Sequence, residues 1–207
     1  MKLVLASANE GKQREFAALL APFGIELLLQ STLGIDSVAE TGTTFEANAL
    51  LKARHAAGGS GLPALADDSG LEVAALAGRP GVWSARFAGA KATDADNIGR
   101  LLAELAGTPW ERRAARYRCV LALVRSADDA APLIASGSWE GRIALQPVGS
   151  GGFGYDPLFV PDGEQRSAAQ LPATVKNVLS HRARALAALL AQLAALPRLD
   201  ALQPAAV

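Results

Sequence analysis

Short apolar runs alternate with amphipathic stretches along most of the chain. Residues 2–6 and 25–29 are short, mainly apolar runs of the kind that form buried strands. The segment between them repeats apolar side chains at i, i+3, i+4 and i+7, which are Phe16, Leu19, Leu20 and Phe23. This spacing predicts a helix with one apolar face, which the Pro22 to Gly24 segment ends.

The alternation of strands and helices continues through the middle of the chain. Thr43 and Glu46 have the spacing of a capping box and predict a helix to about Ala57. Residues 63–67 predict a strand that ends at the polar Asp67-Asp68-Ser69-Gly70 segment, beside a glycine turn. A further helix is predicted from Thr93-Asp94 onward, with an apolar face made of Ile98, Leu101, Leu102 and Leu105.

Strand patterns dominate the next part of the sequence. Residues 116–124 alternate as a strand, and residues 133–139 and 141–145 predict the two arms of a hairpin. A glycine-rich loop at 149–154 leads to a strand that reaches Val160, and one last helix is predicted at about 178–196. Strands and helices are thus intermixed from start to end, which predicts an α/β fold with a mixed sheet.

The domain organisation follows from the absence of any segment in the sequence that would separate two domains. We find no internal repeat, no linker and, beyond the alanine-rich last helix, no low-complexity block in the 207 residues. We therefore predict a single domain with two lobes over residues 1–197, followed by a tail at 198–207.

Composition narrows the class of protein. Half of the residues are hydrophobic and 19% are charged, which provides a core and argues against disorder. The 20 basic and 20 acidic residues balance, so broad capture of nucleic acid is not expected. The sole cysteine, Cys119, excludes an intramolecular disulfide and a Cys-based zinc site.

The sequence starts as a strand rather than as a signal peptide, and its most apolar stretch, 183–196, is too short for a membrane span. We therefore expect a cytoplasmic protein with no membrane partner.

The first candidate for chemistry is the polar turn between the first strand and helix. It comprises Ser7, Ala8, Asn9, Glu10, Gly11 and Lys12. The amides and dipole of a helix start favour anions, and a lysine adds a point charge, so the turn suits a polyphosphate. It does not match the Walker A pattern, and an ordinary polar turn is the alternative interpretation.

Two carboxylate positions form the second candidate. Asp67 and Asp68 follow an apolar strand, and such a position suits a magnesium ligand or a group that activates water. Neighbouring strand residues face opposite sides, so the two carboxylates need not serve one site. Glu40 is a candidate second ligand, whereas a solvated turn and a loop carboxylate are the structural alternatives. Lys52 lies four residues after Asn48 on one helix face, or is a surface lysine with a buried stem.

Two later segments carry groups that suit a base. The loop at 149–157 contains G-x-G-x-x-G in its letters, but Pro157 follows at once and no helix starts there, which excludes a dinucleotide fold. The loop offers Phe153 as a ring for stacking and Asp156 as a carboxylate, although such a ring is more often core. Lys176 and Ser180-His181-Arg182 place several donors near one another, although such a segment is usually just a polar helix turn and its functional interpretation depends on the other candidates.

Eight segments taken in order resemble the Ham1/RdgB family of inosine triphosphate pyrophosphatases. They span about residues 2–196 and read SANEGK from Ser7, ETG from Glu40, FEANA from Phe45, LKA from Leu51, ADDSGL from Ala66, PGVWSAR from Pro80, GGFGYDP from Gly151, and KN with SHR from Lys176 and Ser180. The stretch 168–175 lacks the acidic residues that are usual in the family just before the lysine, which affects the expected geometry of that loop.

The resemblance implies an elongated α/β fold with a mixed sheet, a substrate cleft between two lobes, and a homodimer. It implies Mg²⁺-dependent hydrolysis of noncanonical purine nucleotides (ITP, dITP and XTP) to the monophosphate and pyrophosphate, which cleanses the nucleotide pool. Asp68 is then the proton acceptor and a metal ligand, and Glu40 the second ligand. The substrate contacts implied by position are residues 7–12, Lys52, Ser69, Phe153, Gly154, Tyr155, Asp156, Lys176, His181 and Arg182.

Base selection follows from chemistry in this interpretation. Hypoxanthine and xanthine have an oxo acceptor where adenine has an amino donor, so donors from His181 and Arg182 favour the former. Three alternatives remain: a nucleotide-binding regulator without hydrolysis, a Maf-type pyrophosphatase that acts on modified pyrimidines, and a pure interaction module. The carboxylates argue against the first, the Gly-Gly-Phe-Gly-Tyr-Asp and Ser-His-Arg segments against the second, and the absence of a charged tail against the third.

Overall fold

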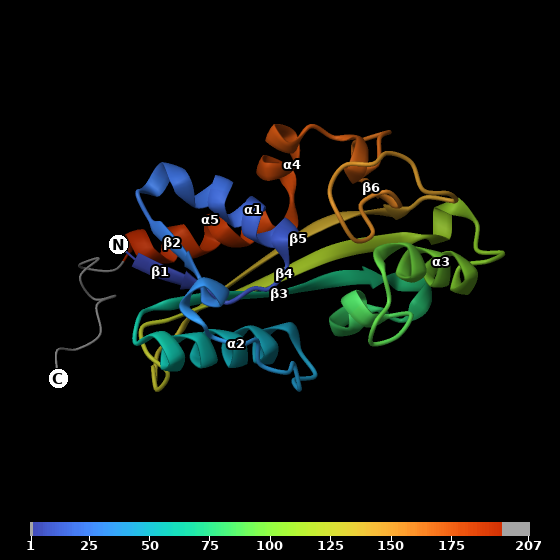
Figure 1. Cartoon of the computed structure of the whole chain (residues 1–207). Coiled ribbons are helices and arrows are strands. Elements are labelled where there is room, and N and C mark those ends of the chain that lie inside the picture. Colours follow the sequence, from blue (N-terminus) through green and yellow to red (C-terminus); the bar gives the residue numbers. More distant parts are fainter. Residues whose placement is uncertain (1, 196–207) are drawn as a thin grey trace. The chain divides into compact units, whose positions relative to one another are not determined.

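The protein contains a six-stranded sheet with helices packed on it (Figure 1). The computed structural model describes residues 2–195. The strands are β1 (Lys2–Leu5), β2 (Glu26–Leu29), β3 (Ala64–Val73), β4 (Ala114–Val124), β5 (Leu133–Ile143) and β6 (Phe159–Pro161). The α-helices are α1 (Glu10–Leu20), α2 (Phe45–Ser60), α3 (Asp94–Glu104), α4 (Ala173–Leu179) and α5 (His181–Ala194).

The sheet is mixed, as the sequence predicts. Its strand order is β2-β1-β3-β4-β5-β6. Strand β1 runs parallel to both β2 and β3, whereas β5 and β6 are antiparallel. The prediction of an α/β fold with a mixed sheet is therefore confirmed.

The chain divides into two compact units, each built from several stretches. The first comprises Met1–Asp68, Cys119–Gly137 and Ala183–Val207, and the second comprises Ser69–Arg118 and Ser138–Arg182. Strands β3, β4 and β5 each contribute residues to both units. The predicted tail at 198–207 lies outside the described residues.

The first unit has a separate core on each face of its part of the sheet. Alternate residues of a strand point to opposite faces, so Leu3 and Leu5 pack with Phe16 of α1 and with α5. Val4 faces the other way and packs with the alanines of α2, among them Ala53. In Figure 1, α1 and α5 lie on one side of β1, and α2 lies on the other. The small alanine side chains let α2 pack closely against its face.

The second unit has one core, which is rich in aromatic side chains. Tyr117, Trp139 and Phe159 from three strands pack with Leu101 and Leu105 of the α3 region. Their rings form a chain of contacts: the centroids of Tyr117 and Phe159 are 4.7 Å apart, and those of Trp139 and Phe159 are 5.4 Å apart. This core anchors the loop at 151–156, because Tyr155 of the loop is one of the residues of the core.

Three strand and helix predictions were wrong at polar or glycine positions. Strand β3 does not end at Asp67 but continues to Val73. Strand β5 is one strand rather than a hairpin, and a Cβ on its Gly141 would lie 2.3 Å from the carbonyl oxygen of Val160. Glycine therefore serves close strand pairing at this position, not a turn. The predicted last helix is two helices, because Ser180 adopts an extended conformation between α4 and α5.

Two smaller expectations also change. The N-cap of α2 is Thr44 rather than Thr43, and its hydroxyl accepts a hydrogen bond from the amide of Ala47. Phe23 lies in a 3-10 turn after α1 and is exposed instead of lying on the buried helix face. The predicted start of a helix at Thr93-Asp94 is confirmed, and Thr93 is its N-cap. Within residues 2–195, every helix falls short of the combined length and apolarity that a membrane span needs.

Candidate active site

The polar turn at 7–12 forms the N-terminus of α1. Asn9 is the N-cap, and its Oδ1 accepts the amide hydrogen of Lys12 at 3.0 Å. The hydroxyl of Ser7 accepts the amide of Asn9, and the carbonyl of Ser7 accepts Nε2 of Gln13 at 2.8 Å. These bonds fix the backbone of the turn, while Ala8 and Glu10 are exposed and Gly11 is half-buried.

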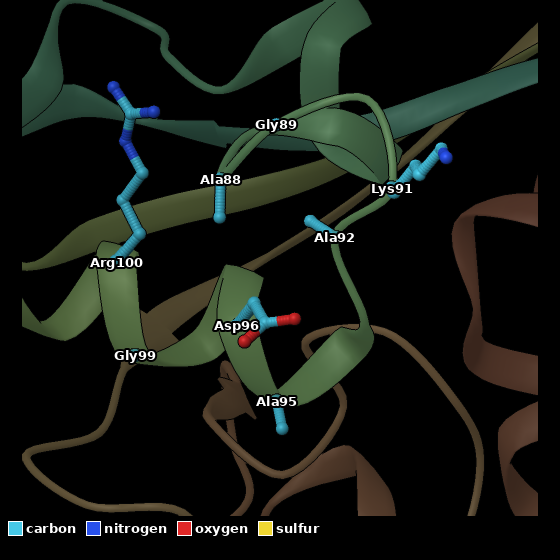
Figure 2. Close-up of a pocket in the computed structure, with 8 residues that line it drawn as sticks. All are labelled: Ala88, Gly89, Lys91, Ala92, Ala95, Asp96, Gly99 and Arg100. Atoms are coloured by element: carbon cyan, nitrogen blue, oxygen red, sulfur yellow. The ribbon is translucent and has the colours of Figure 1, made fainter.

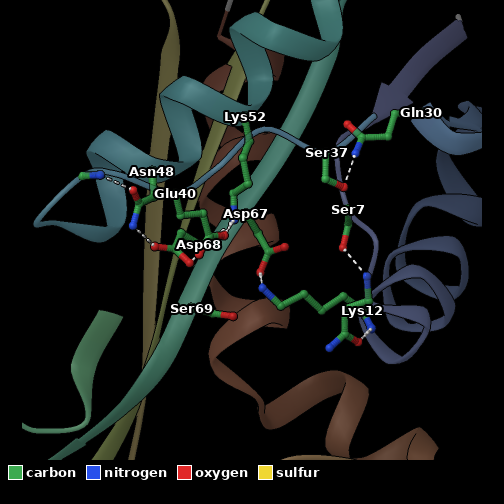
Figure 3. Close-up of polar contacts among 12 residues, drawn as sticks. Ser7, Lys12, Gln30, Ser37, Glu40, Asn48, Lys52, Asp67, Asp68 and Ser69 are labelled. Carbon is green, nitrogen blue, oxygen red and sulfur yellow. Dashed lines mark hydrogen bonds and ion pairs between the residues drawn. The ribbon is translucent and has the colours of Figure 1, made fainter. Parts of the chain in front are cut away.

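Lys12 is held by the first of the two aspartates. Its Nζ lies 2.8 Å from Oδ2 of Asp67, whose side chain is fully buried (Figure 3). The ion pair joins α1 to β3 and places an ammonium at the helix N-terminus. A buried ion pair of this kind fixes the position of its long, otherwise mobile lysine.

Asp68, the next residue on β3, has different partners. Its Oδ2 accepts a hydrogen bond of 3.0 Å from Nδ2 of Asn48, which is fully buried on α2. Oδ1 of Asn48 in turn accepts the amide of Gly42 at 2.7 Å, which fixes the orientation of the amide. As expected for neighbours in a strand, the two aspartates thus serve different helices (Figure 3).

Lys52 lies between the second aspartate and Glu40. Its Nζ is 2.5 Å from Oε1 of Glu40 and 3.6 Å from Oδ1 of Asp68. Asn48 and Lys52 therefore reach the same carboxylate from successive turns of α2. We call the side chains Lys12, Glu40, Asn48, Lys52, Asp67 and Asp68 the acidic cluster.

Burial and charge shift the ionisation of this cluster. Burial is the main cause that raises the pKa of Asp68 above 3.8; Lys52 opposes the rise and the charge of Glu40 adds to it. For Lys52, burial acts to lower the pKa, but the three surrounding carboxylates outweigh it and raise the pKa above 10.5. Asp68 is thus a more basic carboxylate than an exposed aspartate, beside a firmly protonated lysine.

The donor set of the acidic cluster fits a magnesium ion. Glu40 and Asp68 direct carboxylate oxygens at one common cation, the ammonium of Lys52. Across the described stretch 2–195, His, Cys, Asp and Glu form no group of three or more arranged to hold a metal. Mg²⁺ is commonly held by one or two carboxylates together with the phosphates of a substrate, so two carboxylates suffice for that mode.

A second group of predicted residues surrounds Asp156. Its Oδ2 accepts the amide of Phe153 at 2.9 Å and lies 2.7 Å from Nζ of Lys176. A Cβ on Gly152, whose φ is +72°, would lie 2.0 Å from the same oxygen. Only glycine permits this tight turn around the carboxylate. The loop is therefore folded around one buried charge.

Two more bonds hold the rest of the loop. The amide of Gly154 donates to Asp94 at 2.6 Å, and the hydroxyl of Tyr155 donates to the carbonyl of Ser84 at 2.9 Å. Burial raises the pKa of Tyr155, so the hydroxyl stays protonated. Tyr155 is therefore an anchor of the loop, and the contact with substrate that the resemblance implies stays a prediction.

The ring of Phe153 is flanked by two cations. Nζ of Lys176 lies 5.1 Å and Cζ of Arg182 lies 5.7 Å from the ring centroid. Arg182 is almost fully buried and donates to the hydroxyl of Ser69 at 3.1 Å. His181, the first residue of α5, stacks on Tyr117 with centroids 4.7 Å apart and an angle of 11°. We call Tyr117, Phe153, Asp156, Lys176, His181 and Arg182 the aromatic cluster.

The structure thus groups the predicted residues in two sets. Asp68, Glu40, Lys12 and Lys52 meet in the acidic cluster, and the loop, Lys176, His181 and Arg182 meet in the aromatic cluster. Sequence reasoning missed what Asp67, Asn48 and Tyr117 do. The i, i+4 spacing of Asn48 and Lys52 was a usable signal, whereas no local pattern identifies Tyr117.

A cavity of about 600 Å³ lies elsewhere in the second unit, along α3 (Figure 2). Lys91, Asp96 and Arg100 are its charged lining residues, and the others are alanine and glycine. None of the predicted site residues lines it. The carbonyl of Phe87 and the carboxylate of Glu104 already bind the guanidinium of Arg100.

Comparison with known proteins agrees with the arrangement of these motifs. A family model described as the Ham1 family matches residues 3–192. The chain belongs to the Ham1 family. A relative from Methylococcus capsulatus named dITP/XTP pyrophosphatase is 58% identical over 195 residues, which cover 94% of this chain and 97% of the relative. A protein of the same name from Escherichia coli O157:H7 is 52% identical over 189 residues, which cover 91% and 96%.

A solved Ham1 structure shares the fold. The HAM1 protein from Coxiella burnetii has a TM-score of 0.87 and 47% sequence identity, and the match covers 95% of this chain and all of that chain. The Ham1 membership that the motifs predict is therefore confirmed.

Proposed function

We propose that this protein is a nucleoside triphosphate pyrophosphatase that hydrolyses ITP, dITP and XTP to the monophosphate and pyrophosphate. The Ham1 membership and the relatives named dITP/XTP pyrophosphatase support this reaction. The observation that carries it is the environment of Asp68. This carboxylate is buried, its Oδ2 is held by Asn48 and its Oδ1 faces Lys52.

The acidic cluster has the groups that a triphosphate requires. Lys12 and Lys52 are cations whose positions are fixed by carboxylates, and residues 7–12 add the positive end of the α1 dipole. Glu40 and Asp68 would hold Mg²⁺, which when bound offsets the negative charge of the phosphates. The cluster has three carboxylates and two lysines, so it carries a net negative charge that favours a cation before substrate binds.

Asp68 performs the proton transfer in this proposal. A water molecule attacks the α-phosphorus, and a proton of that water passes to the carboxylate of Asp68. The new bond joins the water oxygen to the α-phosphorus, and the bond that breaks joins the α-phosphorus to the bridging oxygen, so pyrophosphate leaves. The raised pKa makes Asp68 a better proton acceptor than an exposed aspartate.

The aromatic cluster provides base recognition in this proposal. Phe153 offers a ring for the purine to stack on, and two cations already flank that ring. His181 and Arg182 are donors for the 6-oxo group of hypoxanthine or xanthine. The amino group of adenine would leave those donors unpaired, which disfavours ATP.

The test is an assay with a panel of triphosphates and Mg²⁺. We expect ITP, dITP and XTP to give a monophosphate and pyrophosphate, and ATP to react much more slowly. Release of inorganic phosphate, or preference for modified pyrimidine triphosphates, would contradict the proposal. Tight binding of dITP with no product would instead identify a nucleotide-binding regulator.

The homodimer and the cytoplasmic location stay predictions. The first is tested by light scattering of the purified protein at micromolar concentration, for which we expect twice the chain mass of 21.3 kDa. A monomer mass under these conditions would contradict it.

A further inference from the structure

Tyr117 connects two parts of the aromatic cluster through two different groups of one side chain. It lies on β4 and is 8% exposed. Its ring stacks nearly parallel on His181, and its centroid lies 4.7 Å from that of the tilted ring of Phe159. Because two rings pack on it, the orientation of the Tyr117 ring is restrained, and so is that of the imidazole stacked on it.

The hydroxyl of Tyr117 reaches the carboxylate around which the loop folds. The side chains of Tyr117 and Asp156 are hydrogen-bonded. A carboxylate only accepts, so the phenol is the donor. Burial foremost, and then the charge of Asp156, raise the pKa of Tyr117 well above 10, so this donor keeps its proton at any physiological pH.

The hydrogen bond from Tyr117 also restrains Phe153, because Asp156 contacts Phe153 directly. The same carboxylate accepts the amide of Phe153 and pairs with Lys176, whose Nζ in turn lies over the Phe153 ring. The hydroxyl of Tyr117 therefore fixes the residue that fixes Phe153, while its ring fixes His181. Both of the groups assigned to the base depend on this one tyrosine.

We propose that Tyr117 is a positioning residue for base recognition: its ring sets the plane of His181, and its hydroxyl holds Asp156 and with it Phe153. The proposal rests on the function proposed above, because it concerns selection of the purine. Tyr117 touches no substrate in this scheme. It prepares the His181 donor and the Phe153 ring in their binding arrangement before the nucleotide arrives.

The two groups of Tyr117 are separable by substitution. Tyr117→Phe keeps the ring and removes only the hydroxyl, so the fold is retained. Tyr117→Leu removes the stacking partner as well. The matched control is Trp139→Phe, which alters a buried ring of the same core that packs on Phe159 and not on His181.

The first measurement is kcat and KM for dITP and for dATP, from which the ratio of the two kcat/KM values follows. We expect Tyr117→Phe to raise the KM for both nucleotides about fivefold, as for loss of one hydrogen bond, with kcat and the ratio retained, because Phe153 stacks on either purine and His181 keeps its stacking partner. Tyr117→Leu should in addition lower the ratio about fivefold, and Trp139→Phe should leave KM and the ratio within about twofold. An unchanged KM for dITP in Tyr117→Phe, an unchanged ratio in Tyr117→Leu, or equal effects in Trp139→Phe, would overturn the proposal.

The second measurement needs no activity. The chain has two histidines, and His55 is exposed on α2, so an NMR spectrum of the imidazole protons contains one stacked ring and one reference ring. We expect the His181 protons to be shifted upfield by the Tyr117 ring in the wild type and in Tyr117→Phe. In Tyr117→Leu the shift should be lost while His55 is unchanged. An unchanged His181 signal in Tyr117→Leu would overturn the proposal.

The two measurements separate the two ideas. If the wild type hydrolysed no purine triphosphate, the proposed function would be wrong, while the NMR comparison would still decide whether Tyr117 orients His181. If the wild type discriminated strongly and Tyr117→Leu discriminated equally well, the function would stand and the role of Tyr117 would be wrong.

Discussion

The acidic cluster and the aromatic cluster fix their polar groups in opposite ways. In the acidic cluster, long lysine side chains are held by carboxylates from other elements, as Lys12 is by Asp67 and Lys52 by Glu40. In the aromatic cluster, rings fix the geometry, and a single carboxylate, that of Asp156, organises the loop.

The difference in charge is as clear as the difference in geometry. The acidic cluster has one carboxylate more than it has lysines, whereas the aromatic cluster has two permanent cations and one carboxylate. A negative cluster that keeps its lysines fixed suits a metal and the phosphates it brings. A positive cluster of flat groups suits an electron-rich base. We therefore propose that the acidic cluster performs the chemistry and that the aromatic cluster selects the base.

The largest effect should come from the acidic cluster. Asp68→Asn keeps the shape of the side chain but removes the proton acceptor, so kcat should fall by about a thousandfold or more, with nucleotide binding largely kept. Steady-state kinetics and calorimetric titration with dITP measure the two quantities. The neighbouring variant Asp67→Asn is the control: it removes the ion pair with Lys12 and should cost about tenfold. Equal losses in the two variants would contradict the division of roles between the aspartates.

Metal dependence should also belong to the acidic cluster. Chelation of Mg²⁺ should abolish turnover, and Glu40→Gln should raise the Mg²⁺ concentration for half-maximal rate about tenfold. Titration of the rate with Mg²⁺ measures this, and His181→Ala, in the aromatic cluster, should leave the half-maximal concentration unchanged. Full activity in the presence of a chelator would refute the metal assignment.

Selectivity should respond to the aromatic cluster. His181→Ala should reduce kcat/KM for ITP relative to ATP by about 10- to 100-fold, because a donor for the 6-oxo group is lost. The control is His55→Ala, which alters the exposed histidine of α2. Parallel loss for ITP and ATP would show that His181 does not read the base.

The smallest expected effect is on the stability of the metal-free protein. The raised pKa of Asp68 means that the folded protein binds the proton of this carboxyl more tightly than the unfolded chain does. This tighter binding stabilises the fold below pH 3.8, and the stabilisation is lost as the pH rises through the folded pKa. At pH 7, Asp68→Asn should therefore raise the melting temperature, by about 2 °C.

The lysine of the same cluster should behave in the opposite way. The pKa of Lys52 is raised, so its charge stabilises the fold at every pH below 10.5, and Lys52→Met should lower the melting temperature at pH 7. Calorimetry in the presence of a chelator measures both variants. A lower melting temperature for Asp68→Asn would contradict the proposed cost of burying this carboxylate.

The sequence predicted the fold class well, because apolar periodicity is a local signal. The buried positions Phe16 and Leu20 of α1 follow directly from residue spacing, and the start of α3 after Thr93 follows from the local sequence. Prediction failed where tertiary partners override local preference. Strand β3 continues through Asp67 and Asp68 because Lys12 and Asn48, distant in sequence, satisfy their carboxylates.

Contacts between residues distant in sequence also explain which features of the site could not be predicted. The role of Tyr117 depends on a ring contact with a residue 64 positions later, since it stacks on His181. The break at Ser180 looks like a continuous helix in the sequence, yet it lets His181 begin α5. Gly141 resembles a turn residue in the sequence, but glycine is required there because the backbone of Val160 on the neighbouring strand approaches it closely.

The most direct measurement is hydrolysis of dITP in ¹⁸O-labelled water, with the products followed by ³¹P NMR. If Asp68 directs water to the α-phosphorus, the label enters dIMP, the pyrophosphate stays unlabelled, and Asp68→Asn gives neither product. Label in the pyrophosphate, or release of dIDP and phosphate, would contradict the proposed reaction.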